Sequence, residues 1–151
     1  MKLISDLRKF RSLGWSDRGL LLEAIGWLAI ARLAILAVPF RWVARWCGLE
    51  TAAGAEEPQE STAPTLGRIA RAVAAAASRT PWESACLARA LAVQTMLRRR
   101  GLTGALFLGV ARGEGDVQRV EAHAWVKSGG KILTGAAGHQ RYAVVSRFSW
   151  R

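Results

Sequence analysis

The sequence predicts an α+β fold in which helices come first and a small antiparallel sheet comes last. Before Gly101 the chain has long apolar or alanine-rich stretches, and after it come short apolar or alternating runs separated by turn residues. With 151 residues, 51% of them hydrophobic and 22% charged, the chain can bury the core of one domain but not of two. We therefore expect a single domain over residues 1–151, with a helical part plus linker over 1–65 and the core over 66–151.

The helical part is apolar and rich in tryptophan. Residues 15–38 predict one long helix with Ser16 or Asp17 as its cap. Pro39 then interrupts the helix, and a second helix is expected over 41–49.

The long helix is apolar enough to resemble a membrane span. Residues 20–38 are nearly continuous apolar sequence. Glu23 and Arg32 lie nine positions apart, so they project from opposite sides of a helix and cannot share one protein-facing stripe. Because a charge near the centre of a bilayer is costly, we expect core packing and a docking surface for a partner rather than membrane insertion.

The middle of the chain combines a linker with two helices. Residues 50–65 are small, acidic and proline-containing, which is typical of a loop. An alanine-rich helix is expected over 66–78, and Pro81 separates it from a helix over 84–100 that ends at Gly101.

Strand patterns follow in the last third. Gly-rich or polar turns separate four short runs, which predict strands over 105–111, 119–127, 131–134 and 142–148.

The net charge is +11, with 22 basic and 11 acidic residues, and most of the excess lies in the second half. Such a surface attracts nucleic acid, anionic lipid or acidic peptide, although an arginine-rich coding bias gives the same composition. Basic residues are not interleaved with stacking aromatic residues, so nucleic-acid binding is not predicted.

The two cysteines, Cys47 and Cys86, are too few for a disulfide framework and their spacing fits no zinc motif. Charged residues interrupt the first apolar residues, so no signal peptide is predicted. We expect a cytoplasmic protein without metal or cofactor.

Cys86 is predicted to lie in the first turn of its helix. Unpaired N–H groups and the positive end of the helix dipole favour a thiolate there, and the same N–H groups can stabilise an oxyanion. A buried, inert cysteine is the alternative. Cys47, within an apolar helix, is expected to be a packing residue.

His123 lies in an alternating strand, on the face shared by Glu121 and Trp125. A thiolate needs a base or an imidazolium partner, and histidine suits that role at neutral pH. An ordinary hydrogen-bonded strand histidine remains the alternative. His139 is a secondary candidate in a predicted loop.

These motifs occur in the order CLARALAVQTMLRRRGL, ALFLGVA, EAHAWV, GGKILTG and YAVVSRF. In this order, over residues 81–148 and more loosely over the N-terminal helices, the chain resembles the transglutaminase-like (papain-like) cysteine peptidases that process lasso-peptide precursors, the leader peptidases called B proteins. The resemblance implies that Cys86 is the nucleophile and that His123 is the general base and acid.

The resemblance also implies partners. A B protein cuts the leader peptide from a ribosomally made precursor, and a separate ATP-dependent cyclase closes the freed core. The first 80 residues show no hairpin, so there is no room for the family's winged-helix recognition domain, and a separate leader-recognition protein is expected.

The chain departs from the family at one position. The family often has an aspartate twelve residues after the histidine, where this chain has Gly135, and no acidic residue follows His123. Asp116 and Glu121 are the acidic candidates for the residue that orients His123. A neutral side chain or a backbone carbonyl are the other options.

Three other functions remain open at this stage. They are a non-catalytic scaffold of the same fold, a thiol acyl transferase and, with the weakest support, nucleic-acid binding.

Overall fold

The computed structural model describes residues 14–47, 50–51, 64–80, 85–113 and 119–150. Helices precede a sheet along the chain, so the fold is mixed α+β as the sequence predicts. The predicted linker lies largely outside the described residues.

The four described helices agree with the predicted helices to within a few residues at either end. They are α2 (Trp15–Ala37), α3 (Phe40–Trp46), α4 (Pro64–Ala77) and α5 (Cys86–Arg98). Gly101 follows α5 with a φ of 67°, and the N–H of Leu102 donates to the carbonyl of Leu97, which confirms the predicted glycine end.

The predicted cap of α2 is wrong. Gly14 is the N-cap and makes no side-chain cap hydrogen bond. Ser16 and Asp17 lie inside the first turn, where both accept hydrogen bonds from Arg68 of α4. A tertiary contact therefore takes the side chains that the local pattern assigned to the cap.

The sheet has five antiparallel strands in the order β1-β5-β2-β3-β4. Their bounds are β1 (Glu50–Thr51), β2 (Gly104–Arg112), β3 (Val120–Ser128), β4 (Lys131–Thr134) and β5 (Ala143–Trp150). The four predicted strands are confirmed. A loop was predicted where β1 pairs with β5, and two residues are too short to carry a strand pattern.

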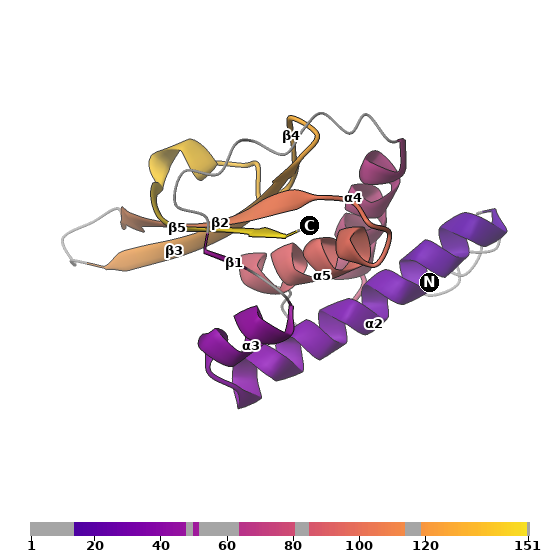
Figure 1. Cartoon of the computed structure of the whole chain (residues 1–151), viewed down its shortest axis with the longest axis horizontal. Coiled ribbons are helices and arrows are strands. Elements are labelled where there is room, and N and C mark those ends of the chain that lie inside the picture. The colour runs from indigo at the N-terminus through magenta and orange to yellow at the C-terminus, as the bar shows by residue number, and fades with distance from the viewer. Residues whose placement is uncertain (1–13, 48–49, 52–63, 81–84, 114–118, 151) are drawn as a thin grey trace, which may run out of the picture.

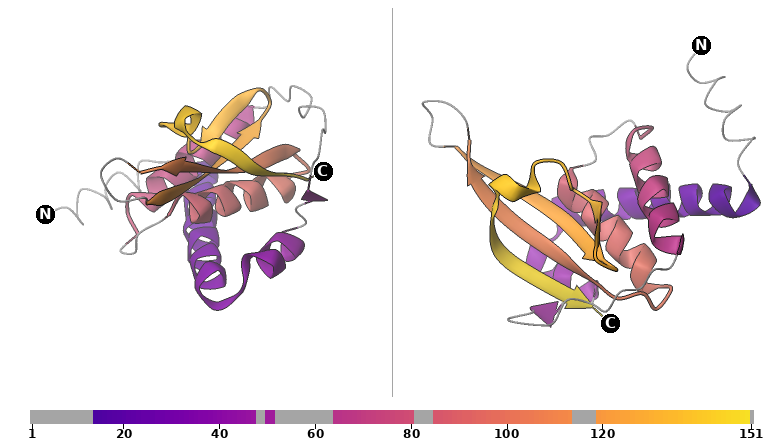
Figure 2. Two further views of the ribbon diagram at one scale, coloured as in Figure 1. Left: turned by 90° about the vertical axis from the view of Figure 1, so that its left-hand side faces the viewer. Right: turned by 90° about the horizontal axis from the view of Figure 1, so that it is seen from above.

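Helix α5 lies between α2 and the sheet, as Figures 1 and 2 show. It packs on α2 and α4 on one side and on β2, β3 and β4 on the other. After α2 the chain turns back into α3, which lies between the end of α2 and β1 (Figure 1), and Phe40 of α3 packs edge-on against Phe148 of β5.

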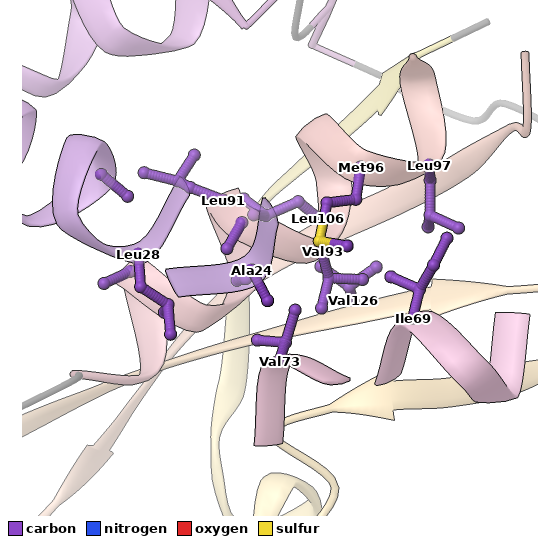
Figure 3. Close-up of a cluster of buried hydrophobic side chains, with 14 of the residues drawn as sticks. Ala24, Leu28, Ile69, Val73, Leu91, Val93, Met96, Leu97, Leu106 and Val126 are labelled. Carbon is purple, nitrogen blue, oxygen red and sulfur yellow. The ribbon is translucent and has the colours of Figure 1, made fainter. Parts of the chain in front are cut away.

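The main core is the space around α5 (Figure 3). Leu28 of α2, Ile69 of α4 and Val126 of β3 are all fully buried in it. Eight of the thirteen residues of α5 are buried, and they are Ala88, Ala90, Leu91, Ala92, Val93, Gln94, Met96 and Leu97. The alanines let α2 and the sheet approach the helix closely on opposite sides.

Helix α2 is long and apolar enough to cross a membrane by length and composition alone, and no other helix in the described ranges is. A core helix can meet the same criterion, but only 28% of the apolar stretch of α2 is buried. Leu22, Leu33 and Leu36 are all more than half exposed. The helix therefore presents a substantial apolar surface away from α5.

An ion pair joins α2 to the end of α5. Arg100 donates to both carboxylate oxygens of Glu23, at 3.1 and 2.6 Å, and Arg99 lies 3.5 Å from the same carboxylate. The hydrogen bond from Arg100 holds the pKa of Glu23 below its usual value of 4.5, although desolvation acts in the opposite direction. Glu23 is thus used to dock α2 on α5.

The lowered pKa predicts an acid-dependent loss of stability. The contribution of the pair is fully present above pH 4.5 and is lost as the pH falls through the lowered pKa of the folded state. Glu23→Gln should remove this part of the pH dependence of the unfolding free energy, measured by urea denaturation on both sides of pH 4.5. Asp17→Asn, which removes another carboxylate of α2, is the control and should retain it. Equal pH dependence in wild type and Glu23→Gln would contradict the assignment.

Candidate functional site

Cys86 is the first residue of α5. The N-cap is Ala85, which offers no side-chain oxygen, so the backbone N–H groups of the first turn have no side-chain cap. The thiol is half-buried and packs against the edge of the hydrophobic core. This is the helix-start position that the sequence predicted.

We infer how far along the sheet Cys86 lies from the lengths of α5 and β2. The helix has 13 residues and therefore spans about 20 Å, which corresponds to about six residues of a strand. It connects through a short turn to Gly104, the start of β2, and packs back along β2 and β3. Six residues along β2 from Gly104 is Val110, beside Gly109, the pairing partner of His123.

His123 is held by backbone and aromatic groups. Its Nε2 lies 2.9 Å from the carbonyl oxygen of Gly135. Since a carbonyl can only accept, Nε2 carries the proton in this contact and Nδ1 of the neutral ring is an acceptor. The imidazole stacks on Tyr142, with ring centroids 4.9 Å apart, and on Trp125 at 6.0 Å.

Gly109 makes room for this cluster. A Cβ atom at this position would lie 2.8 Å from the Cβ of Tyr142 and 2.9 Å from the ring of Trp125. The register of β2 against β5 also shifts between Leu108 and Gly109, and Gly109 pairs with Val144 beyond the shift. A register shift of this kind bends the strand and changes the direction in which the neighbouring side chains point.

Cys86 and His123 lie on different sides of β3, because Cys86 packs against the core around α5. Ala124 and Val126 face the core around α5, so the alternating His123 and Trp125 leave the strand on the other face. None of the hydrogen bonds described between residues 85–113 and 119–150 joins Cys86 to His123. In the described structure β4 pairs only with Val126–Ser128. Beyond that pairing, Gly135 lies against β3 beside Ala124 and reaches His123 through its carbonyl.

The orienting group of His123 is a backbone carbonyl, one of the options that the sequence left open. Glu121 instead accepts a hydrogen bond from Arg141 and lies 3.4 Å from the hydroxyl of Tyr142, so its carboxylate holds the ring on which His123 stacks. Asp116 lies outside the described residues.

Gly135 is specifically suited to its position. Its φ is +75°, where a side chain is strained. A Cβ atom there would also clash with the carbonyl oxygen of Ala124 and lie 2.8 Å from the Cβ of Trp125. The structure therefore leaves no space for the aspartate of the resembled family at this residue.

Sequence reasoning missed the connection between β4 and β5. A short 3₁₀ helix, His139–Arg141, carries Tyr142 and Arg141 back over the face of β3. His139 packs against Trp125, with centroids 5.7 Å apart, and its Nδ1 lies 2.7 Å from the carbonyl of Ala136. Only the combination of small, turn-forming residues with one tyrosine could have indicated this segment.

Cys47, the other cysteine, is half-buried and packs against the core. Burial raises the pKa of its thiol, which disfavours the reactive thiolate. Among the described residues, no group of three or more histidine, cysteine, aspartate or glutamate side chains could hold a metal ion.

Residues 34–147 match the family described as the transglutaminase-like superfamily. The match covers α5 and strands β2 to β4 completely, and with them both Cys86 and His123. No curated protein and no solved structure matches the chain.

The Gly135 carbonyl predicts a specific sensitivity to substitution. Gly135→Ala should displace the carbonyl from His123 and lower the unfolding free energy by about 1 kcal/mol or more relative to Gly130→Ala. Gly130 is the matched control because it has a similar φ of +72° but open space around it. Urea denaturation gives the stability and ¹⁵N NMR of the imidazole gives the tautomer. An unchanged Nε2–H signal in Gly135→Ala would show that the carbonyl does not hold the ring.

Proposed function

The chain belongs to the transglutaminase-like superfamily, and on this premise we propose that it is a cysteine peptidase that removes the leader from a lasso-peptide precursor. It works with a separate winged-helix leader-recognition protein and an ATP-dependent cyclase, in the cytoplasm and without cofactor. Cys86 is the nucleophile and His123 is the general base and acid.

The observation that carries the proposal is the hydrogen bond from His123 Nε2 to the carbonyl of Gly135, twelve residues further along the chain. It supports a catalytic histidine because it fixes the tautomer in which Nδ1 can accept a proton. The aromatic stacking on Tyr142 and Trp125 limits rotation of the same ring.

The chemistry proceeds through a thioester. Nδ1 of His123 takes the thiol proton of Cys86, and Sγ attacks the carbonyl carbon of the last leader residue. The uncapped N–H groups at the start of α5 stabilise the oxyanion. The C–N bond then breaks, and the imidazolium gives its proton to the amine of the departing core peptide. Water, deprotonated by His123, hydrolyses the thioester and releases the leader and the thiol.

A non-catalytic scaffold is the second candidate. It is favoured by the exposed apolar surface of α2 and by the approach of Cys86 and His123 from different sides of β3. In this function the helical part would bind the recognition protein or the cyclase, and the thiol would take no part.

Cysteine substitutions separate the two functions. Cys86→Ser should abolish cleavage of a precursor by the chain with its recognition partner, whereas Cys47→Ser should retain it because burial raises the pKa of that thiol and disfavours the thiolate. Mass spectrometry of the products gives the cleavage and also reveals transfer to an amine instead of water. Iodoacetamide should label Cys86 before Cys47. Full activity in Cys86→Ser would exclude Cys86 as the nucleophile, and no cleavage by the wild-type chain with its partner would leave only the scaffold.

The distance between thiol and imidazole can be tested directly. 1,3-Dibromoacetone carries two alkylating carbons, so it should link the Cys86 thiol to the His123 imidazole when the two groups lie within its length of each other. Peptide mapping should show the bridge in wild type, and His139→Ala should retain it. His123→Ala should lose the bridge and cleave at least 10²-fold more slowly, as expected for loss of a general base. Alkylation of Cys86 without any bridge, in a chain that cleaves normally, would exclude His123 as its partner.

A further inference from the structure

A cavity of about 540 Å³ lies between α2, α3 and the second half of α5. Its volume is in the range of pockets that bind ligands. The lining is mainly apolar and comprises Trp27, Ile30, Ala31, Ala34, Val43, Trp46, Cys47, Leu91, Gln94, Thr95, Arg98 and Arg99. The α5 residues in this lining begin at Leu91 and continue toward the end of the helix opposite to Cys86, so the cavity is separate from the proposed catalytic site.

The polar groups within the cavity bind one another. Gln94 is fully buried, and its amide donates to the backbone carbonyl of Cys47 at 2.8 Å. Thr95 donates to the carbonyl of Leu91 at 2.8 Å. Since burial also keeps the Cys47 thiol neutral, the interior suits an apolar group.

The two charged residues that line the cavity are both basic. Arg98 and Arg99 line it, and both are exposed. Arg99 shares the carboxylate of Glu23 with Arg100 and lies over the ring of Trp27, with its guanidinium carbon 5.7 Å from the centroid. In the described part of the chain Arg98 makes no ion pair. A ligand that places an apolar group in the cavity and carboxylates beside that group is therefore complementary to the arginines.

The apolar surface continues outside the cavity. Ile30 and Trp46 line it and are also 53% and 68% exposed. Leu33, one turn from Ile30, is 66% exposed. An occupant that covers this surface as well as the cavity must be larger than a small molecule.

We propose that this cavity receives an aromatic or large aliphatic side chain from an acidic helical segment of a partner polypeptide. The anchor fills the space between Trp27 and Trp46, and carboxylates on either side of it face Arg98 and Arg99. Flanking apolar residues of the segment cover Ile30 and Leu33. A helical segment can present an anchor and carboxylates on both sides of it at the same time, which favours a polypeptide over a membrane.

Synthetic peptides test the proposal with the purified full-length chain. The probe is a fluorescein-labelled helical peptide with a central leucine–phenylalanine pair among glutamates and alanines. One comparison peptide has alanine at both anchor positions, and another has lysine in place of every glutamate. Fluorescence anisotropy should give a Kd below about 1 mM for the probe, and binding should be at least tenfold weaker for both comparison peptides.

Variants of the chain locate the binding site. Arg98→Glu, on the surface, should weaken binding of the probe at least tenfold, and Ala34→Phe should do so by filling the cavity. Lys131→Glu, an exposed charge reversal in the turn of the sheet, is the matched control and should bind normally. Circular dichroism establishes that each variant is folded, and cleavage of a precursor is measured separately, since loss of peptide binding does not bear on Cys86.

Three outcomes would overturn the proposal. They are no binding of the probe at 1 mM, equal binding of the alanine-anchor peptide, and normal binding by both folded Arg98→Glu and Ala34→Phe. The surface would instead be assigned to a membrane if the chain binds no peptide but sediments with phosphatidylglycerol vesicles, and if Ala34→Phe sediments with them equally well.

Discussion

Helix α5 is buried between α2 and α4 on one side and the sheet on the other, and the remaining elements are placed by how they pack on it. A helix covered on both sides needs small residues where its neighbours approach and large ones where they leave space, and Ala90 beside Leu91 illustrates the alternation. Its one fully buried polar side chain, Gln94, is satisfied by the chain that follows α3, so the polar group also fixes where α3 ends. Burial of α5 thus determines the position of the helices and the sheet together.

The two ends of α5 consequently have different roles. The first turn begins at Cys86, and its backbone N–H groups have no side-chain cap. The last turn carries Arg98, whose charge suits the helix dipole, and Arg99 and Arg100, which follow the helix directly, meet Glu23 of α2. Because the helix is rigidly packed between these ends, chemistry at one and docking at the other can coexist without sharing residues.

The sequence predicted what depends on local patterns, and it failed where a distant group intervened. Helices and four strands followed from apolar periodicity, and Gly101 marked the end of α5. The cap of α2 was wrong because Arg68, fifty-one positions away from Asp17, takes its carboxylate. The anchor of His123 is a main-chain carbonyl, which has no signature in residue type and becomes visible only when β4 returns beside β3. For the same reason the sequence showed that position 135 has no aspartate but did not show which group orients His123 instead.

A carbonyl in place of a carboxylate changes what the site can do. Both groups accept the Nε2 proton and orient the ring, but the neutral carbonyl stabilises an imidazolium less than a negative charge does. A thiolate–imidazolium pair at this site would therefore depend more on the start of α5, whose N–H groups act on the sulfur rather than on the ring. The carboxylate of Glu121 cannot make up the difference directly, since Arg141 neutralises it and Tyr142 separates it from the imidazole. The main electrostatic support for the proposed nucleophile thus comes from the N–H groups at the start of α5, and the packing of α5 holds these groups in place.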